Sequence, residues 1–140
     1  MTGAHWAAPL IGVEWTPERN CWWLVAHYFK ERHGVSMPTV SVGPASGEVL
    51  DNVASIKQAA QCSGWRPVSG PPQADDVLLM RGPFGRRHVG VMLEADGHLG
   101  VLHSDGHMTA RGPCGGVVWQ TLADTTAYGY GNFECWRRTA

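Results

Sequence analysis

The chain has 140 residues, of which 44% are hydrophobic and 16% charged, and its formal net charge is -1. These values are typical of one folded domain that buries its own core, so we expect a single domain over residues 1–140. The small net charge favours neither nucleic acid nor anionic lipid as a partner, and no run of about 18 apolar residues could span a membrane. The first residues also lack the charged start and apolar run of a secretory signal.

A buried helix is the first element that the sequence predicts. Residues 1–20 are rich in turn formers, and the segment that follows, CWWLVAHYFKERH, is apolar on nearly all sides until its charged end. Asn20 is suited to cap this helix at its start, and Gly34 to end it. A second, more amphipathic helix is expected over residues 48–61.

Strand patterns take over after Gly70. Asp96-Gly97 is a strong hairpin signal, and short apolar runs flank it on both sides. The predicted strands cover residues 76–80, 88–93, 100–104, 116–120 and 131–136. Helices followed by antiparallel strands indicate an α+β fold.

Cys21 differs from the other cysteines in its position. Cys62, Cys114 and Cys135 have no comparable setting, and no pair shows the C-x-x-C spacing of a zinc or redox site. We therefore expect no metal. Cys21 opens the predicted helix, where unpaired N–H groups and the helix dipole lower the pKa of a thiol and favour a nucleophilic thiolate. The alternative is a buried structural cysteine.

The predicted hairpin supplies a base for Cys21. With Asp96 and Gly97 as its central pair, residues whose numbers sum to 193 face each other, so Gly90 opposes His103. His88 and His103 then share one face of the sheet, diagonal to each other at roughly 7 Å. One imidazole can take and return a proton while the other holds its tautomer. The alternative is a pair of solvated strand histidines.

The order of these segments resembles a known family. Asn20-Cys21-Trp22-Trp23-Leu24-Val25, the strand Asp76-Val-Leu-Leu, the run His88-Val-Gly-Val-Met-Leu and Val101-Leu-His103-Ser are similar to motifs of the NlpC-type cell-wall peptidases, above all the branch found in phage tails. The resemblance implies a papain-like fold, with N-terminal helices packed on an antiparallel sheet or half-barrel of about five strands. It also implies cleavage of the peptide stems of bacterial peptidoglycan, without a cofactor.

The resemblance also implies roles for single residues. Cys21 matches the nucleophile, His88 the histidine that activates it, and His103 the residue that orients His88. Trp15 falls where the family often has a tyrosine near the oxyanion site. Trp23 replaces a glycine, which implies a narrower pocket beside Cys21.

We therefore expect a cysteine hydrolase, a peptidoglycan endopeptidase or amidase with a Cys-His-His triad. Its expected setting is the virion tail, as a tail-associated lysin made in the bacterial cytoplasm, or delivery to the cell envelope without a cleaved signal peptide. Other tail-tip proteins are the further partners that this setting implies. The alternatives are a non-catalytic structural or binding module of a phage tail, a secreted toxin hydrolase, and an acyltransferase that uses the same cysteine and histidine.

Overall fold

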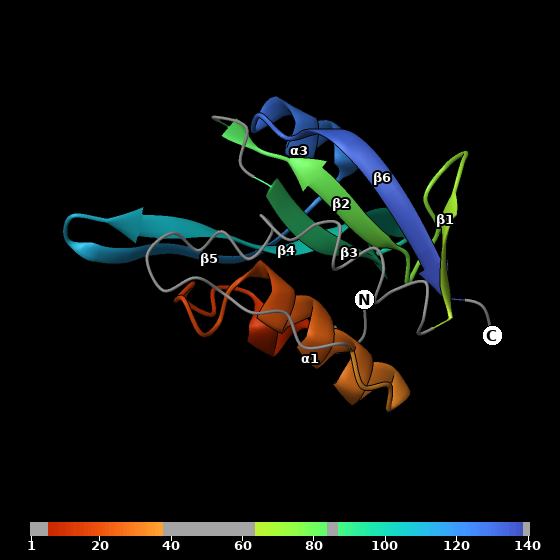
Figure 1. Cartoon of the computed structure of the whole chain (residues 1–140), viewed down its shortest axis with the longest axis horizontal. Coiled ribbons are helices and arrows are strands. Elements are labelled where there is room, and N and C mark those ends of the chain that lie inside the picture. Colours follow the sequence, from red (N-terminus) through yellow and green to blue (C-terminus); the bar gives the residue numbers. More distant parts are fainter. Residues whose placement is uncertain (1–5, 38–63, 84–86, 139–140) are drawn as a thin grey trace.

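The computed structural model describes residues 6–37, 64–83 and 87–138. In this part of the chain, six antiparallel strands form one sheet in the order β1-β6-β2-β3-β4-β5 (Figure 1). The C-terminal strand β6 is therefore inserted between β1 and β2. The elements are η1 (Ala8–Leu10), α1 (Cys21–His33), β1 (Trp65–Val68), β2 (Val77–Arg81), β3 (Arg87–Ala95), β4 (His98–Thr109), β5 (Gly112–Gln120), α3 (Leu122–Ala127) and β6 (Gly131–Arg138).

The helix α1 forms where the sequence predicts it, with both predicted caps. The Asn20 side chain accepts a hydrogen bond from the backbone N–H of Trp23 at 2.9 Å, which satisfies one of the unpaired donors of the first turn. Gly34 ends the helix in a left-handed conformation with φ 64°. Leu24, Val25 and Phe29 are fully buried, because this helix packs against β3 and β4.

The β3–β4 hairpin has the predicted register. Val91 pairs with Leu102, and Ala95 with His98, so the facing residues sum to 193. Asp96 and Gly97 both have positive φ, at 51° and 78°, as a two-residue turn of the mirror-image type requires. A local turn signal therefore determines which side chains of these two strands share a face.

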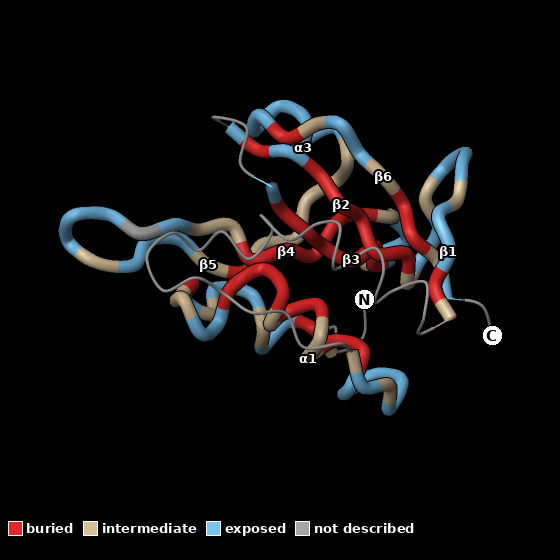
Figure 2. The backbone as a smooth tube through the Cα atoms, viewed as in Figure 1, coloured by how far each residue is buried: buried red, intermediate tan, exposed pale blue. Residues whose placement is uncertain are grey.

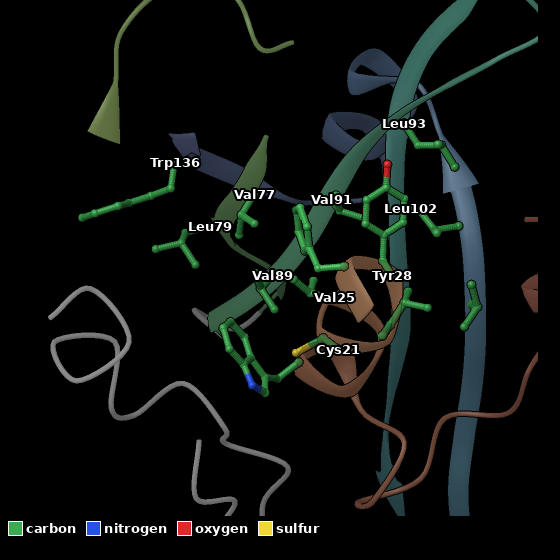
Figure 3. Packing of buried hydrophobic residues seen from close by; sticks show 14 of the residues in the cluster. Cys21, Val25, Tyr28, Val77, Leu79, Val89, Val91, Leu93, Leu102 and Trp136 are labelled. Carbon is green, nitrogen blue, oxygen red and sulfur yellow. The ribbon is translucent and has the colours of Figure 1, made fainter. Parts of the chain in front are cut away.

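Two apolar cores occupy the two faces of the sheet. The larger core lies between the sheet and α1, and its members include Cys21, Val89, Val91 and Leu102 (Figure 3). The smaller core contains Met92 and other residues from the alternate strand positions. Figure 2 shows the consequence: the central strands are buried along most of their length, whereas the tip of the β4–β5 hairpin is exposed.

An N-terminal segment covers part of the free edge of β5. The Gly12 N–H donates to the Val117 carbonyl, and the Trp15 N–H to the Gly115 carbonyl, both at 2.9 Å. The lead-in that the sequence predicts as irregular is therefore held against the sheet edge. No helix in the described part of the chain is long and apolar enough to cross a membrane.

The expected α+β, papain-like fold class is wrong. The described chain is mainly β: six strands instead of about five, with α1 as its only helix longer than two turns. The helix expected over residues 48–61 lies outside the described residues. The strand β1 was not expected; it contains Pro67, which it tolerates because it lies at the edge of the sheet. The short helix α3 was not expected either.

Candidate functional site

Two histidines from the β3–β4 hairpin are in direct contact. Nε2 of His88 lies 2.8 Å from Nδ1 of His103, and the two rings are nearly perpendicular, at 80°. His88 is 8% exposed and His103 is fully buried. The predicted juxtaposition of these side chains is confirmed, and it follows from the hairpin register because both residues occupy the same side of the pleat.

The hydrogen-bonded chain continues beyond His103 to the last residue of β5. Oε1 of Gln120 lies 2.9 Å from Nε2 of His103. Both ring nitrogens of His103 therefore have a hydrogen-bonding partner inside the protein. Burial lowers the pKa of His103 below its ordinary value, and the hydrogen bond to Gln120 and the charge of Asp105 oppose this shift only in part.

Tyr130 packs against both histidines. Its ring stacks on His88 at a centroid distance of 4.9 Å and an interplanar angle of 29°, and it meets His103 edge-on at 81°. The Tyr130 hydroxyl donates a hydrogen bond to the carboxylate of Asp105, two residues after His103 in β4. This tyrosine directly precedes β6, so the site also draws on the segment that leads into the last strand.

Cys21 lies where the sequence places it, at the first position of α1 directly after Asn20. It is 4% exposed and belongs to the larger core, together with Val25 of α1 and Val89 of β3 (Figure 3). Val89 follows His88 directly, but His88 stacks on Tyr130, which belongs to the smaller core. The structure therefore joins the two histidines to each other, and it packs Cys21 in the larger core and Tyr130, which stacks on His88, in the smaller one.

The two candidate tryptophans have distinct surroundings. Trp15 is buried, and its side chain lies so close to Gly106 of β4 that a Cβ there would come within 2.4 Å of it. Trp23 is partly exposed and stacks on His27 one turn later, at a centroid distance of 5.0 Å and an angle of 17°. The guanidinium of Arg19 lies over the same indole, 5.6 Å from its centroid. Their expected roles in oxyanion and substrate binding stay predictions.

Sequence reasoning missed Gln120, Tyr130 and Asp105. Gln120 reaches His103 because β5 pairs with β4 in a register that places Val118 opposite His103, two residues before Gln120. The turn that sets this register, at residues 110–111, is Ala-Arg, which carries no type I′ signal. From the sequence, Gln120 could have been found only by aligning the alternating apolar residues of β4 and β5.

Comparison with known proteins shows a likeness to a phage tail protein. No protein-family model matches the chain. Over 102 residues the chain is 31% identical to the tail tip assembly protein K of Escherichia phage N15. The matched stretch is 72% of this chain but only 41% of the phage protein. The resemblance to NlpC-type peptidases therefore stays a prediction.

Proposed function

We propose that this chain works at the tip of a phage tail, as a structural component or in its assembly. The likeness to the tail tip assembly protein K of Escherichia phage N15 supports this role, because 31% identity extends over most of the chain. The chain spans 41% of that protein's length, so only this general setting is carried over. Other tail-tip proteins are the partners that the role implies.

Deletion of the gene in the phage or prophage that carries it tests the tail role. We expect particles with absent or defective tails, or particles that fail to infect, and rescue when the gene is supplied in trans. Electron microscopy and plaque counts are the measurements. Normal tails and full infectivity without the gene would refute the proposal.

The chemistry that we propose within this setting is thiol-based hydrolysis of amide bonds, with the peptide stem of peptidoglycan as substrate. The contact between His88 and His103, buried and extended to Gln120, carries this proposal. A buried, hydrogen-bonded histidine pair of this kind suits a general base and the group that orients it. Cys21 adds the nucleophile, because it opens a capped helix whose first N–H groups favour negative charge.

In the proposed reaction, His88 takes the proton of the Cys21 thiol as the sulfur attacks the amide carbonyl. The proton then passes from His88 to the departing amine, the C–N bond breaks, and a thioester remains on Cys21. A water molecule that gives its proton to His88 attacks the thioester. This second step releases the acid and restores the thiol. Backbone N–H groups at the start of α1 are suited to stabilise the oxyanion.

Purified protein incubated with peptidoglycan is the direct test of the hydrolase. Newly exposed amines are measured for the parent chain, for Cys21→Ala and for Cys114→Ala. Cys114 is the matched control, because it is an exposed cysteine near the tip of the β4–β5 hairpin. We expect Cys21→Ala to lose activity while its circular dichroism stays unchanged, and Cys114→Ala to keep it. Equal activity of Cys21→Ala and the parent would refute the mechanism.

A non-catalytic tail module is the second candidate, and the burial of Cys21 favours it. The Cys21 side chain lies among apolar residues in a cluster separate from that of the histidine partner Tyr130. Alkylation rates of single thiols, read by mass spectrometry, separate the two candidates. A hydrolase requires fast labelling of Cys21 that slows in His88→Gln. A non-catalytic module requires slow labelling of Cys21 and fast labelling of the exposed Cys114 in both proteins.

A further inference from the structure

Gln120 is a polar residue at the end of β5 that faces the histidine pair. It pairs with Val101 in β4 and lies diagonal to His103, within reach of a long side chain. Its side-chain oxygen is 2.9 Å from Nε2 of His103, a residue with no exposed surface. This hydrogen bond therefore reaches into the sheet's buried interior.

The direction of this hydrogen bond decides where the protons of both histidines lie. An amide oxygen only accepts, so Nε2 of His103 must carry a proton. Burial keeps His103 neutral at ordinary pH by lowering its pKa, which leaves Nδ1 of His103 without a proton. The 2.8 Å contact with His88 then requires Nε2 of His88 to donate. In neutral His88, the lone pair lies on Nδ1.

Tyr130 holds the rings in the orientation that this chain of hydrogen bonds needs. It stacks on His88 and meets His103 edge-on, and its hydroxyl is tied to Asp105. A rotation of either imidazole would have to displace the tyrosine ring. The amide of Gln120 can therefore determine which ring nitrogens carry protons, while Tyr130 keeps the positions of both imidazole rings unchanged.

We propose that Gln120 is a positioning residue that sets the tautomers of His103 and His88 and so presents Nδ1 of His88 as the basic nitrogen. The catalytic consequence rests on the hydrolase proposed above: Nδ1 is the atom that would receive the Cys21 proton. The opposite orientation of the Gln120 amide would put a proton on Nδ1 of His88 and remove that base. Gln120 thus controls the proton acceptor without touching the reacting groups.

The tautomers can be read directly, independently of activity. In protein labelled with ¹⁵N-histidine, long-range proton–nitrogen NMR separates protonated from unprotonated ring nitrogens, and single His→Asn variants assign the signals. We expect both His88 and His103 to be neutral near pH 8, with the proton on Nε2. A proton on Nδ1 of His88 would overturn the proposal.

Two variants of Gln120 complete the test. Gln120→Glu keeps an oxygen acceptor and is expected to keep the tautomers, whereas Gln120→Met has a similar length but no acceptor. We expect Gln120→Met to show mixed tautomers and about tenfold lower kcat, with little change in KM. About tenfold is the change in tautomer population that the loss of one hydrogen bond allows. Unchanged tautomers in Gln120→Met would overturn the inference. If the parent chain shows the expected tautomers but no hydrolase activity, the role of Gln120 is supported and only the proposed hydrolase is refuted.

Discussion

Replacement of Asn20 by alanine should weaken the start of α1, on which the position of Cys21 depends. Asn20 is 3% exposed and makes two side-chain hydrogen bonds, accepting from the Trp23 N–H at 2.9 Å and donating to the Pro17 carbonyl at 3.0 Å. Loss of an N-cap costs about 0.5–2 kcal/mol. We expect a value near the upper end, about 2 kcal/mol, because the unpaired groups would be buried.

Urea unfolding followed by tryptophan fluorescence and circular dichroism measures this change. With a denaturant slope of about 2 kcal/mol per molar urea, the midpoint should fall by about 1 M. Asn20→Ser is the matched control: it keeps an acceptor for Trp23 and loses only the bond to Pro17, so we expect about half of the shift. An alanine variant within about 0.2 M of the parent, or a serine variant as unstable as alanine, would refute the capping argument.

Two further predictions concern the sheet. Because burial lowers the pKa of folded His103 below the ordinary 6.5, the folded state binds a proton less readily than the unfolded state. The free energy of unfolding should therefore be highest above pH 6.5 and fall as the pH drops below it, by at most about 1.4 kcal/mol per pH unit. Urea titrations at several pH values should show a flatter pH dependence for His103→Gln. An equally steep dependence in that variant would contradict the role of His103. In Gly106→Ala, the new Cβ would lie 2.4 Å from the Trp15 side chain and 2.5 Å from the Cys114 carbonyl oxygen, so we expect a loss of about 1–3 kcal/mol and a lower Tm. Gly131→Ala, with no atom within 4 Å of its Cβ, should leave the Tm nearly unchanged, and equal Tm values for the two variants would exclude the steric explanation.

Local sequence signals predicted the parts of the fold that depend on near neighbours. Asn20 and Gly34 determine where α1 begins and ends, because a cap acts within one helical turn. Asp96-Gly97 determines the β3–β4 register, because this dipeptide readily adopts the positive φ angles of a tight turn. The contact between His88 and His103 follows from that register alone. For this reason the sequence was sufficient to pair them.

Long-range pairing was not predictable in the same way. The strand β6 lies between β1 and β2, although these two end at Val68 and Arg81 and β6 begins only at Gly131. No local pattern encodes such an insertion. The expectation of a papain-like α+β fold failed for this reason, since it weighed the order of elements and not their partners in the sheet.

In the candidate site, too, some contacts follow from local sequence signals and others from long-range packing. Its histidine pair is a property of the sequence, because both residues belong to one hairpin with a clear turn signal. Gln120 and Tyr130 join the pair only through the pairing of β5 with β4 and the position of the segment before β6. Whether Cys21 faces the histidines is likewise decided by how α1 packs on the sheet, which places its thiol in the larger core. Packing between distant segments decides such contacts, because it depends on shape and burial that no short stretch of sequence contains.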